Sequence, residues 1–168
     1  MKLLFLDIDG VLNDHSRLPN GLSTIQPDKS AHLNRILAEV SDCQIVVSSA
    51  WRYYVHNKYM TMDGFTMMLQ THGLNCHGRI HGITDPDPET FHPDAHEQPF
   101  DEQKWYERGL AWRAVQIAEY WDRHGAPARC AILDDLPLCA AMGGALFQTD
   151  KHVGLTAEIA DAVILRLK

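Results

Sequence analysis

Two pairs of carboxylates stand out in this sequence, because each pair comes at the end of a short apolar run. The run KLLFL leads into Asp7 and Asp9, and the run CAIL leads into Asp134 and Asp135. Acids gathered in one crevice repel each other, by on the order of 4 kcal/mol for two charges about 4 Å apart at an effective dielectric of about 20. A divalent cation relieves this repulsion, and Mg²⁺ is bound by a few carboxylates together with water and phosphate oxygens. The four acids therefore predict a Mg²⁺ site, and the alternative is a set of coupled acids that share protons without a metal.

The same acids are suited to phosphoryl transfer. A carboxylate can attack phosphorus and form a covalent aspartyl-phosphate, and a second acid two residues further on can protonate the leaving oxygen and later activate water. The reaction otherwise needs groups that position the phosphoryl oxygens and neutralise their charge. Ser48 and Ser49, which end another apolar run, can supply a hydroxyl, and Gly10 lets the main chain approach a ligand closely.

The apolar runs that lead into these residues are typical of buried parallel strands, because they are continuous rather than alternating. We expect strands at 2–6, 44–49, 78–84, 130–135 and 145–150. Helical stripes alternate with them, and we expect helices from Pro27 to Val40, around 65–72, at about 104–124 and after Thr156. This alternation predicts an α/β fold, a three-layer Rossmann-like sandwich with a central parallel sheet of about five strands and right-handed crossovers. Ligands bind outside the carboxyl ends of such strands, so the acids and serines should converge there.

Length and composition favour an ordinary globular chain. The 168 residues are 45% hydrophobic and 22% charged, which suits one domain over residues 1–168 with a sizeable core. No apolar run approaches the roughly 18 residues of a membrane helix, and the cysteines form no CxxC pair, which favours a cytoplasmic protein with reduced thiols. The net charge of -7 is concentrated in residues 85–107, so the sequence predicts no basic face that would grip nucleic acid by itself.

Three segments in this order, DIDGVLN, VVSSAWR and ILDD, resemble motifs I, II and IV of the haloacid dehalogenase (HAD) superfamily of phosphatases. SSAWR and the late TDKHVGLT resemble in particular the minimal HAD domains associated with RNA-repair proteins. The resemblance implies that Asp7 is the nucleophile and a metal ligand. It implies that Asp9 is the general acid/base, with its backbone carbonyl on the metal. It also implies that Asp134 binds Mg²⁺ directly or through water, with Asp135 beside it.

The resemblance also implies how the phosphoryl group is held. Ser48 binds the transferring phosphoryl group, and Ser49 is the competing candidate. The segment RAVQIAEYW is similar to the third-motif helix and puts Arg113 in the place usually held by lysine. Arginine is a planar fork rather than a point charge, and Arg108 and Lys104 are rival candidates for this cation.

The spacing of the motifs leaves little room for a cap domain. The stretch between the first two motifs holds mostly a loop and one helix, so we expect a minimal cap or none, with 85–103 as an acidic, proline-rich loop or small lid. An open site accepts large substrates, and Trp51 and Arg52, beside Ser49, are candidate substrate contacts.

These observations predict a Mg²⁺-dependent phosphohydrolase, a phosphomonoesterase that acts on a phosphorylated small molecule. One alternative is a 3′- or 5′-phosphatase that acts on nucleic-acid ends within a repair system and relies on a protein partner to grip its substrate. The net positive segment 48–84 keeps this alternative open. The other alternative is a non-catalytic HAD-like binding module. No association with a membrane is expected.

Overall fold

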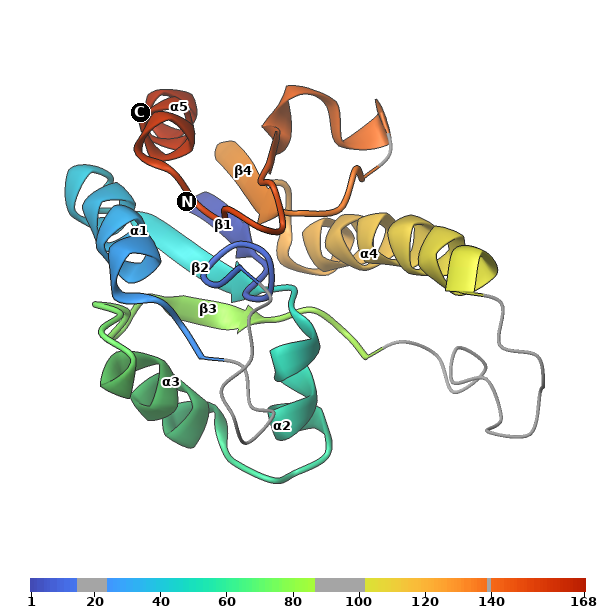
Figure 1. Ribbon diagram of the computed structural model, residues 1–168, viewed down its shortest axis with the longest axis horizontal. Helices are drawn as coiled ribbons and strands as arrows, with labels where there is room; N and C mark the ends of the chain where they lie inside the picture. The colour runs from blue at the N-terminus through green and yellow to red at the C-terminus, as the bar shows by residue number, and fades with distance from the viewer. Residues whose placement is uncertain (15–23, 87–101, 139) are drawn as a thin grey trace.

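Five parallel strands form one sheet through the centre of the protein (Figure 1). The computed structural model describes residues 1–14, 24–86, 102–138 and 140–168, and it gives the side chains of all of these except 102–111, 140, 141 and 143. The strands are β1 (Lys2–Leu6), β2 (Cys43–Val47), β3 (Ile80–Ile83), β4 (Arg129–Asp134) and β5 (Leu146–Gln148). Their order across the sheet is β3-β2-β1-β4-β5, and each neighbouring pair is parallel. The expected α/β fold with a parallel sheet of five strands is confirmed.

Helices cover both faces of the sheet and complete three layers. They are α1 (Pro27–Glu39), α2 (Tyr53–His56), α3 (Met62–Thr71), α4 (Glu102–His124) and α5 (Ala157–Leu167), with short 3₁₀ turns η1 (Ala50–Arg52) and η3 (Ala140–Ala145). Apolar side chains of α1, α3 and α5 pack on one face of the sheet, and those of α4 pack on the other. None of the described helices is long and apolar enough to cross a membrane.

Several helix and strand ends have a local cause. Pro27 lies in the first turn of α1, where its missing N–H would have had no intrahelical partner. The Thr156 hydroxyl accepts a hydrogen bond from a main-chain N–H of α5 and caps that helix. Gly73, at φ 84°, follows α3. β4 ends one residue earlier than expected, because Asp134 Oδ1 accepts a hydrogen bond of 3.0 Å from Leu136 N and the chain turns there.

The expected lid falls largely on residues 87–101, which lie outside the described residues. Just before them, the carboxylate of Asp85 pairs with Arg123 of α4. The carbonyl oxygen of Asp85 accepts a hydrogen bond of 3.1 Å from Arg52 Nε. The chain that leaves β3 is therefore fixed against α4 at this point.

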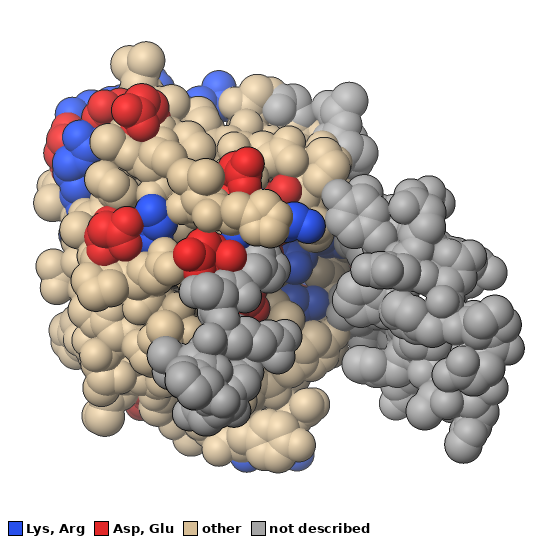
Figure 2. All heavy atoms as spheres, in the orientation of Figure 1, with Lys and Arg blue, Asp and Glu red and all other residues tan. Residues whose placement is uncertain are grey.

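The basic residues of the segment 48–84 do not combine into a basic surface. Arg52 is 2% exposed, and Arg79 donates hydrogen bonds to two main-chain carbonyl groups. Lys58 is exposed. On the face drawn in Figure 2, the Lys and Arg side chains of the described residues are interspersed with Asp and Glu. The net positive charge of this segment therefore gives no continuous patch for a phosphate backbone among the described residues.

Candidate active site

The carboxyl ends of β1, β2 and β4 lie side by side and carry polar residues at one level. In the register of the sheet, the last residue of β1 lies opposite the last residue of β2 and the second-last residue of β4, so Asp7, Ser48 and Asp134 come next on three adjacent strands. Side chains alternate between the faces of a sheet. The residues two positions earlier pack on the face covered by α4: Phe5, Val46 and Ile132. The alternation therefore directs Asp7, Ser48 and Asp134 to the side of α4.

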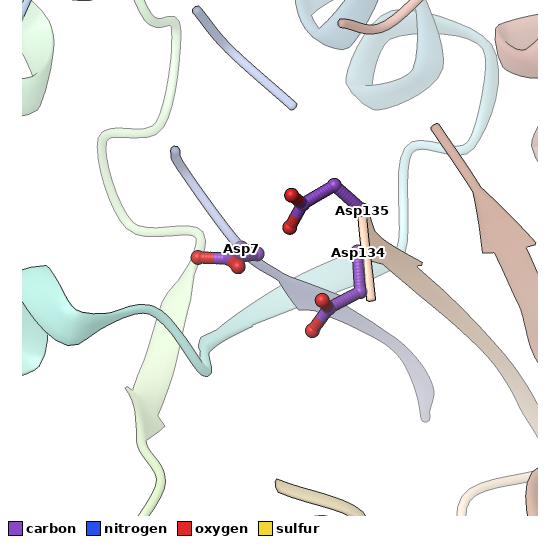
Figure 3. A group of neighbouring side chains, drawn as sticks. All are labelled: Asp7, Asp134 and Asp135. Carbon is purple, nitrogen blue, oxygen red and sulfur yellow. The ribbon is translucent and has the colours of Figure 1, made fainter. Parts of the chain in front are cut away.

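Three carboxylates gather at this edge of the sheet. One oxygen from each of Asp7, Asp134 and Asp135 lies within 4.8 Å of the others, and Figure 3 shows the three side chains together beyond β1 and β4. Asp7 and Asp134 are buried, and Asp135 is half-buried. All of these donors are hard oxygens, which suit Mg²⁺. The donor set therefore fits the metal that the sequence predicts, and these three residues could hold it.

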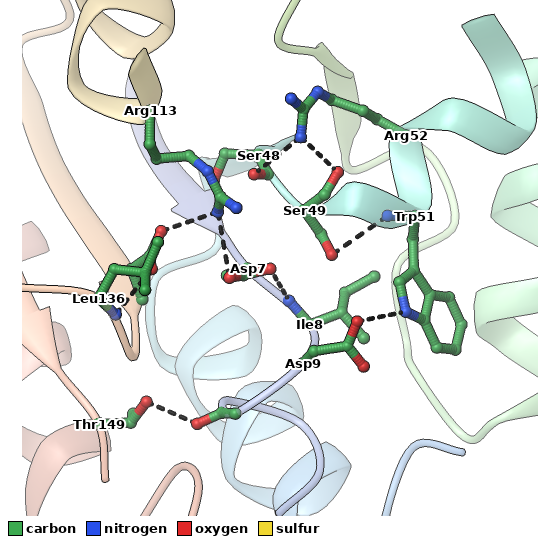
Figure 4. Close-up of polar contacts among 12 residues, drawn as sticks. Asp7, Ile8, Asp9, Ser48, Ser49, Trp51, Arg52, Arg113, Leu136 and Thr149 are labelled. Carbon is green, nitrogen blue, oxygen red and sulfur yellow. Dashed lines mark hydrogen bonds and ion pairs between the residues drawn. The ribbon is translucent and has the colours of Figure 1, made fainter. Parts of the chain in front are cut away.

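One guanidinium, that of Arg113 on α4, bridges two of the carboxylates (Figure 4). Its Nη1 lies 3.1 Å from Asp7 Oδ2 and 2.9 Å from Asp134 Oδ2. Burial raises the pKa of the Asp134 carboxyl to about 7, the positive charge of Arg113 opposes this rise, and the negative charge of Asp7 adds to it. The rival cations, Lys104 and Arg108, lie on the part of α4 whose side chains are not described.

The two serines after β2 have different surroundings. Both are fully buried, but the Ser49 hydroxyl accepts a hydrogen bond of 3.3 Å from Trp51 N and so caps η1. The Ser48 hydroxyl has no hydrogen-bond partner among the described residues. An unpaired buried hydroxyl costs about 1–3 kcal/mol, which a ligand oxygen would recover. Of the two alternatives that the sequence leaves open, the geometry favours Ser48.

The side chain of Asp9 is turned away from the other three carboxylates. Its Oδ2 accepts a hydrogen bond of 3.0 Å from Trp51 Nε1, and its Oδ1 accepts one of 2.8 Å from Asn13 Nδ2. Asn13 is almost fully buried and also accepts a hydrogen bond of 3.0 Å from Gly10 N. Of the four acids predicted to bind the metal, the structure thus brings the carboxylates of three together and places that of Asp9 beside Trp51.

Gly10 contacts Asp135, the acid that follows β4. Gly10 has φ 75°, and a Cβ built on it would lie 2.6 Å from Asp135 Cγ. Its carbonyl oxygen also accepts a hydrogen bond of 2.7 Å from Thr149 Oγ1. The sequence predicted that Gly10 permits a close approach of the main chain to substrate. In the structure, the close approach is to a carboxylate of the site.

Arg52, a predicted substrate contact, supports the end of β2 from within the protein. Its Nη1 donates hydrogen bonds to the carbonyl oxygens of Ser48 and Ser49, at 3.4 and 2.8 Å. Its Nη2 lies 3.3 Å from Gln116 Oε1 on α4. The structure does not bring Arg52 to the three clustered carboxylates, and it gives the arginine contacts that hold the serine segment in place.

Two residues near the site were not singled out from the sequence. Asn13 holds Asp9, and Thr149 holds the carbonyl of Gly10. Asn13 had a detectable signal, because it is a polar residue that directly follows the apolar pair of Val11 and Leu12 in the first motif. Thr149 begins the segment TDKHVGLT, which carries part of the family resemblance, but the sequence did not indicate its contact with Gly10, because that contact depends on how β5 lies in the sheet.

The comparison with protein families agrees with this geometry. The model of a family described as the HAD domain in Swiss Army Knife RNA repair proteins matches residues 3–160. The chain belongs to this family. Every residue of the site described above lies within the matched part of the HAD domain, and the resemblance stated from the motifs is confirmed. No curated protein and no solved structure matches the chain.

Proposed function

We propose that this HAD domain is a Mg²⁺-dependent phosphomonoesterase that works through an aspartyl-phosphate on Asp7. The observation that carries the proposal is the grouping of Asp7 with Asp134 and Asp135, with Arg113 in contact with the first two. Phosphoryl transfer depends mainly on positioning and on neutralisation of charge. A buried carboxylate between a cation and a set of metal-binding oxygens is suited to attack a phosphate ester.

The residues around Asp7 hold its carboxylate in one orientation. Oδ1 accepts a hydrogen bond of 2.7 Å from Ile8 N, and Oδ2 pairs with Arg113 Nη1. Mg²⁺, when held by the three carboxylates, neutralises negative charge on the phosphoryl group. In this proposal, Arg113 and the Ser48 hydroxyl bind phosphoryl oxygens, and this contact gives the Ser48 hydroxyl a hydrogen-bond partner.

Asp9 then moves the protons. As a carboxyl oxygen of Asp7 bonds to phosphorus, the bond to the leaving oxygen breaks and protonated Asp9 gives that oxygen its proton. Asp9, now ionised, takes a proton from water as the water oxygen attacks phosphorus. The bond between phosphorus and Asp7 breaks, and free phosphate leaves. Trp51 and Asn13, which hold both oxygens of Asp9, keep this carboxyl in place between the two steps.

The test is Asp7→Asn, assayed for release of phosphate from p-nitrophenyl phosphate with Mg²⁺. We expect turnover to be lost while the fold is kept, because the change removes the nucleophilic charge and little volume. Circular dichroism checks the fold, and Asp63→Asn, at an exposed acid in the first turn of α3, is the matched control. Residual activity within about tenfold of the parent would refute the covalent route.

A second candidate function is removal of a 3′- or 5′-terminal phosphate from nucleic acid. The family to which the chain belongs is described by its place in RNA repair proteins, and this favours the candidate. Because the described basic residues of segment 48–84 form no continuous patch, a protein partner would supply grip on the rest of the strand. Rates on p-nitrophenyl phosphate and on 3′- and 5′-phosphorylated oligonucleotides distinguish the two functions. A non-catalytic module would release phosphate from none of them.

A further inference from the structure

An aromatic pocket lies directly after β2 and adjoins Asp9 through the side chain of Trp51. It has a volume of about 250 Å³ and is lined by Ala50, Trp51, Tyr53, Tyr54 and Tyr59. Tyr54 is 42% exposed and Tyr59 is 76% exposed, so rings of α2 and of the following turn are open to solvent. Pockets for drug-sized ligands measure roughly 300–1,000 Å³. This one is therefore suited to a single ring system rather than to a whole nucleotide.

One side chain belongs both to the pocket and to the site. The Trp51 indole lines the pocket, and its Nε1 donates a hydrogen bond of 3.0 Å to Asp9 Oδ2 (Figure 4). The indole is also fixed by edge-on ring contacts with Tyr54 and His72, at centroid distances of 6.3 and 6.4 Å. Asp9 is the acid that protonates the leaving oxygen. The pocket therefore lies on the side of the site from which the leaving group departs.

We propose that the pocket binds the nucleobase of a leaving nucleoside, which is the base nearest to the phosphate that Asp7 attacks. The proposal rests on the proposed function for the direction of the leaving group, and it adds the substrate class. Aromatic side chains stack on nucleobases, and this contact tolerates any sequence because every base has a π-face. The pocket offers four aromatic residues and little else, so the recognition is of a ring and not of a particular base.

The charges of the surrounding segment support stacking over binding of the phosphate backbone. Arg52 is buried beneath the serines, and Arg79 donates to main-chain carbonyl groups. Lys58 lies in the turn before Tyr59 and is exposed. A surface that neutralises several phosphates needs several exposed cations. The described part of segment 48–84 presents exposed aromatic rings rather than several exposed cations.

The test measures binding without turnover, in the Asp7→Asn protein with Mg²⁺, by isothermal titration calorimetry. The ligands are adenosine 5′-monophosphate, adenosine 3′-monophosphate and ribose 5-phosphate, which lacks the base. We expect at least one adenosine phosphate to bind roughly tenfold more tightly than ribose 5-phosphate, because one base stacks in the pocket. Equal affinity of all three ligands would overturn the proposal.

Substitutions in the pocket locate the effect. Tyr54→Leu and Tyr59→Leu keep an apolar side chain but remove the ring, so both should reduce the preference for the adenosine phosphate. Tyr54→Phe and Tyr59→Phe should retain it, and Leu165→Ala, at a residue of α5 that is 77% exposed, should behave like the parent. Tyr59 is mostly exposed, so its substitution leaves the fold intact. A preference that survives both leucine variants would place the base elsewhere and overturn the proposal.

The same variants separate this proposal from the proposed function. Suppose that the protein binds adenosine phosphates through the pocket but the Asp7→Asn change does not reduce turnover. The covalent mechanism on Asp7 is then refuted, and the proposal that the pocket binds a base is kept. Suppose instead that the parent hydrolyses adenosine monophosphates and ribose 5-phosphate with equal kcat/KM and binds them with equal affinity. The proposed phosphatase activity is then kept, and the proposal that the pocket binds a base is refuted.

Discussion

Arg113 reaches both carboxylates through one nitrogen, Nη1. A guanidinium can bind a carboxylate through two nitrogens, and this is the usual reason why lysine cannot replace arginine. Here the contacts to Asp7 and Asp134 use the arginine as a single point of positive charge. This explains how arginine can stand where the resemblance to HAD phosphatases leads one to expect lysine.

We therefore predict that Arg113→Lys loses less than about tenfold in kcat on p-nitrophenyl phosphate, whereas Arg113→Gln loses about 10²–10³-fold, as when one charge-stabilising donor is removed. Without Mg²⁺, Arg113→Gln should also lower the free energy of unfolding by about 3–5 kcal/mol, because it leaves buried carboxylates without their cation. Steady-state kinetics and urea denaturation measure the two effects.

Arg123→Gln is the matched control for Arg113, since Arg123 is also on α4 but pairs with Asp85 in a half-exposed ion pair. It should change kcat little. Equal losses in Arg113→Lys and Arg113→Gln would show that the planar fork, and not the charge, is what the site requires.

At the scale of single residues, the sequence predicted the identities of the site better than their orientations. Asp7, Asp134 and Asp135 could be found because each follows an apolar strand. The sequence could not decide between Ser48 and Ser49, because the choice depends on which face of the sheet each side chain points to after β2. The position of the Asp9 carboxylate could not be predicted either, because it is set by contacts with Trp51 and Asn13.

At the scale of elements, the loop after β1 and the turn after β4 pack against each other through Gly10 and Asp135. A methyl group on Gly10 would collide with the carboxyl group of Asp135 and displace a residue that could hold the metal. The two loops therefore act as one unit, although their residues lie far apart in the sequence.

Gly10→Ala should raise the Mg²⁺ concentration for half-maximal activity by about 10–100-fold, the range seen when a residue that positions metal ligands is changed. Gly78→Ala is the control, because Gly78 also has a positive φ of 66° but a Cβ there would meet nothing within 4 Å. Both variants share the cost of alanine at positive φ, about 1–2 kcal/mol. Activity measured over a range of Mg²⁺ concentrations distinguishes the collision with Asp135, which only Gly10→Ala introduces, from the backbone strain that both variants share. Equal Mg²⁺ requirements in the two variants would contradict the prediction.

Secondary structure was predictable where a local pattern determines it. The continuous apolar run of β1 correctly predicted that this strand begins at Lys2, and the proline correctly predicted that α1 begins at Pro27. Arg52 shows the limit of such patterns. Its contacts reach Asp85 beyond β3 and Gln116 on α4, so only the assembled fold shows that this arginine supports the main chain.

At the scale of the whole molecule, the site gathers carboxylates in a part of the fold that is largely withdrawn from solvent. Asp7 and Asp134 are 5% and 0% exposed, and their mutual repulsion opposes folding when no metal is bound. A ligand that binds only the folded state stabilises it in proportion to the logarithm of its concentration. Magnesium should therefore affect the stability of the entire protein.

We predict that saturating Mg²⁺ raises the melting temperature by about 5–10 °C, as expected for about 2.7 kcal/mol of binding energy at a hundred times the dissociation constant. Differential scanning fluorimetry with and without EDTA measures the shift. Asp135→Asn should reduce it by more than half, while the control Asp63→Asn should keep it. Absence of any shift in the parent protein, or an equal shift with Na⁺ at matched ionic strength, would count against a metal site.

The central place of β1 in the sheet has a consequence for how the protein is made. β1 is the first of the five strands to leave the ribosome, but one of its two neighbours, β4, spans Arg129–Asp134. Until β4 has been synthesised, the edge of β1 that later pairs with β4 is open to pairing with other chains. A nascent chain therefore carries Asp7, the proposed nucleophile, long before it carries Arg113 and Asp134, and the proposed site is complete only in a late step of translation.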